Sequence, residues 1–403
     1  MDGIFHPWDL AGSILNVVEA VKLFAAAGTF FVVGVILTIR QPRSPNRALC
    51  TMVPRKVYNL CQGPTVTSEL ACDPSQCPQK VFHKLVEGQT RKKDSVEDLH
   101  DDKLSKWDTL DELQKARACG QFGSTETSDL FLKVYHDALC SLEKNPKSGV
   151  VSPKLLGSTG VVPLTIVAPL PDLCRHLANC IARAESEVFL GTNFWIHSDA
   201  STLVTNAIRE LSKRAGQRGQ KVVMKMIYDR GDPRQYIDGK VKLPAASEIP
   251  NVDLQVINFH RPVFGTFHAK FTVIDRRIAL IQSSNIQDND NLEMLAHIEG
   301  PIVDSFYDAA LLSWGKPLKP PFSLLNSPAA NAPIPCHGEQ SDGIPLADGN
   351  GVLAEHTTTS PSYDVDLNHE AWRVNNRIHP KGNETRTKAV SRHLSMYSFT
   401  YSG

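Results

Sequence analysis

The sequence predicts an α/β fold in which helices flank a mixed β-sheet. The main observation is that short apolar runs alternate with amphipathic helical patterns between residues 161 and 314. The second is that two of the helical patterns begin at residues that favour a helix start, a proline and a serine–aspartate pair. Strands that alternate with helices are typical of layered α/β folds, so this region is the predicted folded lobe.

The first half of the lobe reads as strand, helix, strand. The run PLTIVA at 163–168 is strand-like, and the segment 171–185 opens with a proline and repeats apolar residues on one helical face. The run EVFLGTNFW at 187–195 is rich in β-branched and aromatic residues. These three patterns predict the first strand–helix–strand unit.

The second half continues the alternation and ends in a hairpin. The segment 198–216 opens with capping residues and closes at a glycine, which predicts a helix. Buried strands are predicted at 221–229 and 252–259. Residues 268–284 read as two strands joined at Asp275, Arg276 and Arg277.

The residues before the lobe predict a membrane anchor followed by an extension. Residues 23–39 carry no charge, and several basic residues follow them, which would keep the rest of the chain on the cytoplasmic side. A buried core helix or a mistaken gene start would also explain this run. The predicted division of the chain is an N-terminal region 1–40, an irregular then helical extension 41–160, the lobe 161–314, a disordered low-complexity linker 315–383, and the incomplete start of a second lobe 384–403.

Composition sets limits on the function. The formal net charge is +0, which argues against a protein that wraps nucleic acid by bulk charge, although it leaves room for a local basic cleft. The 9 cysteines are irregularly spaced and suit a reducing compartment better than a disulfide scaffold. Cys61, Cys72 and Cys77 lie close in sequence, but they lack a fourth ligand and the tight spacing of a zinc site, so we interpret them as free thiols.

The residues that carry chemistry lie around the predicted hairpin. His268 and Lys270 are two apart, so on a strand they share one face. The lysine charge disfavours protonation of the histidine, which keeps the imidazole nucleophilic, and the same charge suits a phosphate. Ser283 and Asn285 are again two apart and offer hydrogen bonds to phosphate oxygens. Two acidic residues complete the pattern: Asp275 closes the first strand and would orient its neighbours, and Glu293 would hold a histidine nitrogen.

This spacing resembles the phospholipase D superfamily. His268, Lys270, Asp275, Ser283 and Asn285 each fall on the family's spacing, and Glu293 matches its later acidic residue. One position departs from the pattern, because Gln282 stands where the family has glycine. The resemblance extends less specifically over residues 160–312, and the chain is most similar to two-copy phospholipase D and cardiolipin synthase-like proteins of fungal type. It implies a phospholipase D-like layered fold.

The resemblance also implies a chemistry. One histidine attacks phosphorus and forms a phosphohistidine, a second histidine protonates the leaving alcohol, and no metal or other cofactor takes part. Catalytic roles are implied for His268, Lys270 and Asp275, and substrate binding for Ser283, Asn285 and Glu293. The expected activity is that of a phosphodiesterase or phosphatidyltransferase on phospholipid at a membrane.

The chain carries the motif once. The sequence HPK at 379–381 is a decoy, because Arg386 stands where the motif needs an aspartate. Three explanations remain open: a missing second motif-bearing half, a homodimer that pairs two motifs, or an inactive protein that binds anionic lipid. A homodimeric nuclease-like phosphodiesterase is the alternative activity.

Overall fold

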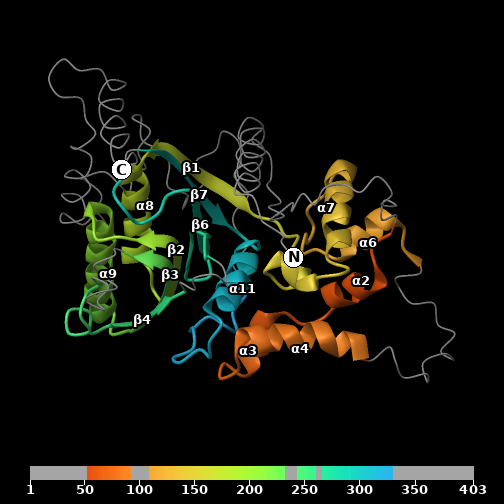
Figure 1. Cartoon of the computed structure of the whole chain (residues 1–403), viewed down its shortest axis with the longest axis horizontal. Coiled ribbons are helices and arrows are strands. Elements are labelled where there is room, and N and C mark those ends of the chain that lie inside the picture. The colour runs from red at the N-terminus through yellow and green to blue at the C-terminus, as the bar shows by residue number, and fades with distance from the viewer. Residues whose placement is uncertain (1–51, 92–108, 232–242, 260–265, 290, 330–403) are drawn as a thin grey trace, which may run out of the picture. The chain divides into compact units, whose positions relative to one another are not determined.

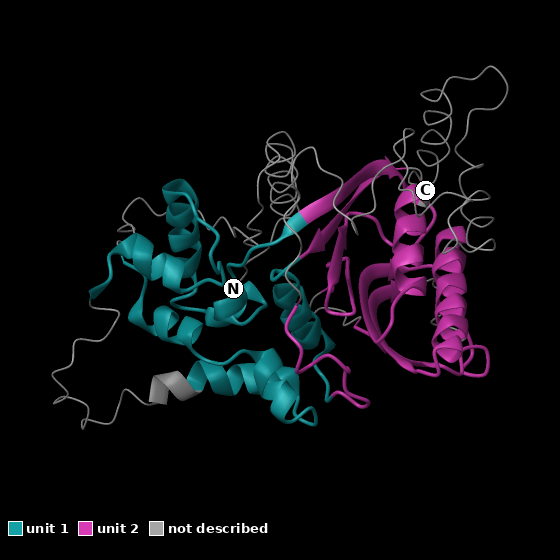
Figure 2. Ribbon diagram, turned by 180° about the vertical axis from the view of Figure 1, so that it is seen from behind, with its two compact units in different colours: residues 1–161, 300–317 teal, residues 162–299, 318–403 magenta. Residues whose placement is uncertain are grey.

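The computed structural model describes residues 52–91, 109–231, 243–259, 266–289 and 291–329 (Figure 1). The chain divides into two compact units, shown in Figure 2. Unit 1 comprises residues 1–161 and 300–317, and unit 2 comprises residues 162–299 and 318–403. The predicted start of a second lobe at 384–403 lies outside the described residues, as does most of the predicted linker.

Unit 1 is helical in the part of it that the structure describes. A buried aspartate, Asp308, joins two of its helices: its carboxylate accepts hydrogen bonds from the N–H and the hydroxyl of Thr67, and from the N–H of Ser152 at 2.8 Å. Such bonds satisfy a charge that would otherwise be costly to bury. Its elements are α2 (Arg55–Gln62), α3 (Val66–Cys72), α4 (Pro78–Arg91), α6 (Glu112–Ala118), α7 (Asp129–Ser141), the 3-10 turns η2 (Pro146–Gly149) and η3 (Pro153–Leu155), and α11 (Val303–Trp314).

Unit 2 contains a seven-stranded mixed sheet in the order β1-β7-β6-β5-β2-β3-β4. Strands β2, β3 and β4 are parallel, while β5, β6 and β7 are antiparallel to their neighbours from β2 onward. The α/β class with a mixed sheet flanked by helices is therefore confirmed. The strands are β1 (Val161–Pro169), β2 (Glu187–Trp195), β3 (Val222–Gly231), β4 (Val252–Asn258), β5 (Phe271–Ile274), β6 (Ile278–Gln282) and β7 (Leu292–Glu299), and the helices are α8 (Leu170–Ala182) and α9 (Asp199–Gln217).

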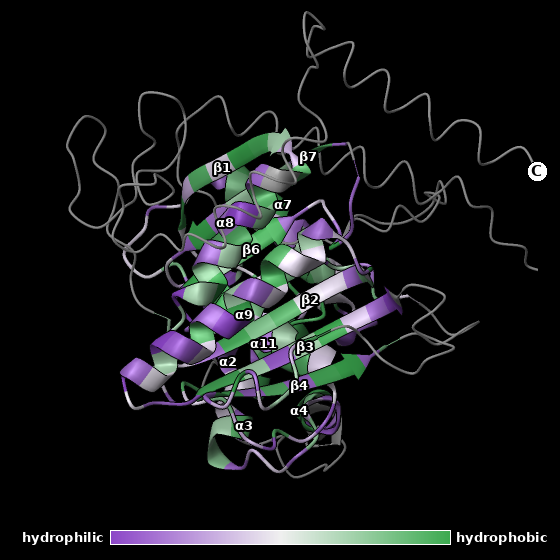
Figure 3. Ribbon diagram, turned by 90° about the vertical axis from the view of Figure 1, so that its left-hand side faces the viewer, coloured by the Kyte–Doolittle hydropathy of each residue, from purple (hydrophilic) through white to green (hydrophobic). Residues whose placement is uncertain are grey.

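Helices α8 and α9 bury their apolar faces on the sheet. Figure 3 shows α8 and α9 lying across the sheet, with hydrophilic residues along their outer sides. Leu173, Leu177 and Ile181 of α8 and Leu203 and Leu211 of α9 belong to one buried cluster with the sheet. The Ser198 side chain caps α9 by accepting the Ser201 N–H, as the capping residues predicted.

Residues 318–325, which the sequence assigned to the linker, pack on unit 2. Arg276 donates to the carbonyl oxygens of Leu324 and Leu325 at 2.8 and 2.9 Å, and the Leu324 N–H donates to Glu187. Phe322 lies over the buried ammonium of Lys225, which is 5.4 Å from the ring centroid. The ordered part of unit 2 therefore extends beyond the predicted lobe boundary at 314.

The predicted membrane anchor requires a correction. Among the residues that the structure describes, no helix has both the length and the apolar character needed to cross a membrane. The apolar run 23–39 itself lies outside the described residues. The prediction of a membrane anchor with a cytoplasmic catalytic lobe depended on this apolar run and on the basic residues after it, and the structure does not support it.

Candidate phosphodiester site

Most of the motif residues gather at one edge of the sheet. The parallel strands β2 and β3 end at this edge. Strand β5 is antiparallel to β2 and begins on the side of this edge, with Phe271 paired to Gly191 in the middle of β2. Strand β6 ends at the same edge, where Gln282 pairs with Leu295 near the start of β7. The carboxyl ends of parallel strands are where α/β folds place ligands. His268, Lys270, Ser283, Asn285 and Glu293 all belong to this edge.

His268 and Lys270 lie side by side just before β5, whereas the sequence placed them within a strand. The Lys270 Nζ atom is 3.4 Å from each ring nitrogen of His268 and donates to the His268 carbonyl oxygen at 2.9 Å. The Lys270 carbonyl still accepts the Gln282 N–H at 3.1 Å, which continues the β5–β6 ladder by one residue. His268 is exposed and Lys270 is buried, so the imidazole is open to solvent and the lysine lies beneath it.

The surroundings keep His268 neutral. Partial burial lowers the pKa of its imidazole, and the positive charges of Lys270 and Arg230 lower it further. The Asp229 carboxylate acts in the opposite direction but does not cancel these effects. A neutral imidazole has a lone pair to give to phosphorus, so the environment favours the nucleophilic form near pH 7.

Lys270 has an unusually low pKa for a lysine. Burial lowers the pKa of its ammonium from 10.5 to about 8, and the Glu293 carboxylate opposes this shift. At pH 7 the side chain still carries its charge, which a phosphodiester anion needs.

The lowered pKa of Lys270 is expected to set the alkaline limit of activity. We expect kcat/KM to fall as the pH rises through about 8, because the ammonium that binds the phosphate loses its proton there. In the Lys270→Arg variant the alkaline limb should move upward by more than one pH unit, because a guanidinium does not titrate in this range. A pH profile of kcat/KM on a chromogenic diester measures both. An identical alkaline limb in the two proteins would contradict this assignment.

Ser283 and Glu293 form a hydrogen-bonded pair. The Ser283 hydroxyl donates to Glu293 Oε2 and accepts the Met294 N–H at 2.8 Å, and Asn289 donates to Glu293 Oε1 at 3.4 Å. Within the described residues, Glu293 thus bonds to a serine and an asparagine rather than to the histidine that the sequence suggested. We infer that it orients Ser283 and supports the charge of Lys270.

Asn285 is fixed by the end of β2. Its Oδ1 atom accepts the Phe194 N–H at 3.3 Å, and the next residue, Ile286, exchanges backbone hydrogen bonds with Phe194 and Ile196. With the oxygen engaged by the backbone, the donor end of this amide is the end suited to a phosphate oxygen.

The Asp275 side chain bonds to the backbone at the start of β2. Its carboxylate accepts the backbone N–H groups of Glu185, Ser186 and Glu187 at 2.8, 2.8 and 3.0 Å. The residue lies in the β5–β6 turn with φ 50°, at the opposite end of β5 from His268. These bonds hold the start of β2 to the hairpin, and the catalytic role of Asp275 stays a prediction.

Two buried polar residues outside the motif hydrogen-bond to the backbone of Phe267, the residue before His268. Asn193 donates to the Phe267 carbonyl oxygen at 2.9 Å, and Asp229 accepts the Phe267 N–H at 2.6 Å. They lie two residues before the ends of β2 and β3, and Gly191 leaves space for the Phe267 ring, which a Cβ atom would approach to 3.1 Å. The sequence places Asn193 near the end of a strand, on the side where α/β sites usually lie, but it indicates neither this bond nor the role of Asp229.

We expect the Asn193→Ala variant to lower kcat by about 10- to 100-fold, because small displacements of a reacting group are costly. The Phe267 carbonyl would lose its partner, and the His268 backbone would shift, while the motif itself stays intact. Steady-state kinetics with a circular dichroism spectrum measures this effect. If a folded Asn193→Ala protein keeps the parent kcat, the pair does not position His268.

Comparisons with known proteins give likenesses of fold. No family model matches the chain, and no curated protein does. Among solved structures it is similar to NucT from Helicobacter pylori, at 17% identity and TM-score 0.26, over 38% of this chain and 97% of that one. It is similar to Nuc from Salmonella typhimurium, a phospholipase D family member, at 19% identity and TM-score 0.29, over 38% and 95% of the two chains. Polyphosphate kinase from Porphyromonas gingivalis gives 18% identity and TM-score 0.26, over 40% and 27%.

Proposed function

We propose that unit 2 carries half of a phospholipase D-type phosphodiesterase site. The observation that carries the proposal is the neutral, exposed His268 beside the buried cation Lys270 at the carboxyl edge of the sheet. In the first step the imidazole lone pair forms a bond to phosphorus and the bond to the leaving oxygen breaks. A second histidine, in its protonated form, gives that oxygen a proton and becomes neutral. It then takes a proton from water or an alcohol, whose oxygen bonds to phosphorus as the bond to His268 breaks, and the product is a monoester or a new diester.

The other residues of the edge stabilise the negative charge on the reacting phosphoryl group. Lys270 supplies a fixed positive charge in a partly desolvated place, where electrostatic attraction is stronger than in water. The Asn285 amide donates to a phosphoryl oxygen, and Ser283 is held in place by Glu293. The step needs no metal ion, because the charge is supplied by side chains.

The second histidine comes, in this proposal, from a second copy of the chain. The sequence contains the motif once, and a two-fold axis through the edge would bring two His268 side chains to one phosphorus. One would act as nucleophile and the other as acid. A longer natural chain with its own second motif would give the same chemistry without a dimer.

Phospholipid is the proposed substrate class. A formal net charge of +0 gives no bulk attraction for a polyanion, whereas a single phosphodiester needs only the local charge of Lys270. A nuclease-like activity is the alternative, and one observation favours it: Arg230 lies 5.7 Å from the ring centroid of Phe194, at the ends of β3 and β2. Cation and aromatic ring together suit a nucleotide.

The test is turnover of a chromogenic diester, a fluorescent phosphatidylcholine in mixed micelles, and a labelled oligonucleotide, with the molar mass measured by light scattering. The parent chain is then co-expressed with increasing amounts of the His268→Ala chain. If two copies build the site, activity falls with the square of the parent fraction, to about a quarter at equal amounts. A linear fall, to about a half, would mean that each chain acts alone.

The outcomes separate the parts of the proposal. Turnover of phosphatidylcholine without cleavage of the oligonucleotide supports the lipid substrate, and the reverse result supports the nuclease. A folded monomer without turnover of any diester contradicts activity of this chain by itself. Binding of anionic lipid that survives His268→Ala, without turnover, would indicate a non-catalytic binder.

A further inference from the structure

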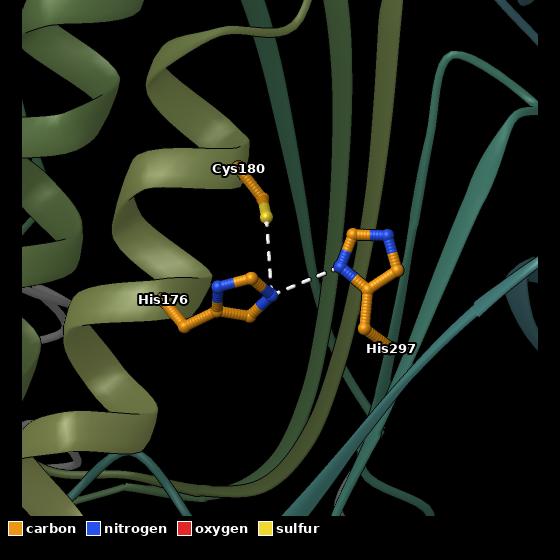
Figure 4. Close-up of side chains that lie close together, drawn as sticks. All are labelled: His176, Cys180 and His297. Carbon is orange, nitrogen blue, oxygen red and sulfur yellow. Dashed lines mark hydrogen bonds between the residues drawn. The ribbon is translucent and has the colours of Figure 1, made fainter. Parts of the chain in front are cut away.

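A second cluster of chemically reactive side chains lies inside unit 2, apart from the motif. His176 and Cys180 are one turn apart on α8, and His297 reaches them from β7 (Figure 4). The Nε2 atom of His176 is 3.0 Å from Nδ1 of His297 and 3.6 Å from Sγ of Cys180. All three side chains are buried, with relative exposures of 1%, 7% and 4%. Three potential metal ligands therefore meet in a dry place.

The Nε2 atom of His176 has two close neighbours, His297 Nδ1 and Cys180 Sγ, and only one of these contacts can be a good hydrogen bond. His297 Nε2 is 3.0 Å from Glu299 Oε1, so it donates its proton to the carboxylate and presents a lone pair at Nδ1. One ring nitrogen of His176 carries either one proton or one lone pair. It can therefore form only one good hydrogen bond, either to His297 or to Cys180. A cation between the three atoms would accept a lone pair from each.

We propose that His176, Cys180 and His297 bind a thiophilic d10 cation, of which Zn²⁺ and Cu⁺ are the common biological examples. Thiolate and imidazole are the ligands that both ions prefer. At bond lengths of about 2.0–2.1 Å to nitrogen and 2.3 Å to sulfur, ligand atoms of a tetrahedral ion lie roughly 3.3–3.7 Å apart. The observed separations of 3.0 and 3.6 Å are close to this range, and all three ligand atoms lie within 4.8 Å of one another.

Glu299 hydrogen-bonds to His297 on the side of the ring away from the cluster. Metal-bound histidines usually donate their other N–H to a carboxylate, which fixes the tautomer and the ring. Glu299 does this for His297 and leaves Nδ1 toward the cluster. On binding, the Cys180 thiol loses its proton, and the thiolate offsets one positive charge of the ion.

The site would connect α8 to the strand that carries Glu293. His297 and Glu293 are four residues apart on β7, so they share a face of the strand, about 13 Å apart. Glu293 in turn holds Ser283 at the phosphodiester edge. The ion is thus structural: it fixes α8 against β7 and takes no part in the reaction.

The experiment measures metal directly. The full chain, purified without chelator, is analysed by plasma mass spectrometry, and metal-free protein is titrated with Co²⁺ under reducing conditions. We expect close to one equivalent of zinc or copper per chain, and a cobalt spectrum with an intense near-ultraviolet thiolate band and strong visible bands of tetrahedral coordination. Which metal is found, and whether Zn²⁺ or Cu⁺ displaces Co²⁺, decides between the two ions.

Variants locate the ligands. Cys180→Ser should abolish the thiolate band, and His297→Asn should weaken Co²⁺ binding at least about 10-fold. Cys174→Ala is the matched control, because Cys174 is another buried cysteine of α8 outside the cluster, and its spectrum should match that of the parent. If the variants do not fold, the metal content and the cobalt spectrum of the parent protein still decide the test. A folded parent chain that binds no stoichiometric metal and gives no thiolate–cobalt band overturns the proposal, as does a band that survives Cys180→Ser.

Discussion

His268→Ala is expected to lower kcat by at least about 10⁴-fold, because the variant lacks the atom that bonds to phosphorus. The side chain is exposed, so its loss should leave the fold and the thermal midpoint nearly unchanged. Turnover of a chromogenic diester, followed together with thermal unfolding, measures both effects. His268 should also be the residue whose loss cannot be offset by more substrate, since it acts in the chemical step and not in binding.

A matched control is available for this variant. His83 is an exposed histidine of α4 in the other unit, with 54% side-chain exposure, and His83→Ala should keep the parent kcat. If His268→Ala retains even a tenth of the parent activity while folded, the nucleophile lies elsewhere.

Asp275→Asn is expected to destabilise the protein by about 2–4 kcal/mol, because one carboxylate accepts three backbone N–H groups. An asparagine has one acceptor oxygen and would direct its NH₂ group toward a donor. The positive φ of residue 275 is compatible with asparagine, so backbone strain does not add to the loss. Denaturant unfolding measures the free energy, and kcat per folded molecule should fall less than about threefold.

This prediction separates two roles for the same residue. If Asp275 acts in catalysis, as the motif alone suggested, the variant would lose turnover at unchanged stability. Asp137→Asn is the comparison, since Asp137 is a surface carboxylate with 82% side-chain exposure. Its stability should change by no more than about 0.5 kcal/mol.

The sequence was sufficient for the elements of unit 2 and for the neighbourhood of His268 and Lys270. Strand and helix patterns are local, and so is the effect of a lysine two residues from a histidine. The structure confirms a β5–β6 hairpin, with Asp275 and Arg276 both at positive φ in its turn. The direction of the His268 pKa shift also agrees with the prediction.

The hydrogen-bond partners of the site residues could not be predicted, because these contacts join residues far apart in the sequence. The hydrogen-bond partners of Asp275 are about ninety positions earlier in the chain, and no local sequence pattern indicates them. The bonds of Asn193 and Asp229 to Phe267 need the strand order of the sheet, and so does the meeting of His176 with His297, which are 121 residues apart. Cys61, Cys72 and Cys77 are close in sequence, whereas the proposed metal ligands His176, Cys180 and His297 are brought together only by the fold.

The central claim is that His268 becomes covalently bonded to phosphorus. The direct measurement is a rapid alkaline quench of the parent chain during turnover of a slowly released diester, followed by peptide mass spectrometry. Phosphohistidine survives alkali and is lost in acid, so the quench preserves it. The account predicts a phosphoryl adduct on the peptide that contains His268, formed as fast as turnover requires and absent from His268→Ala. Turnover without this adduct, or an adduct on another residue, would contradict the account.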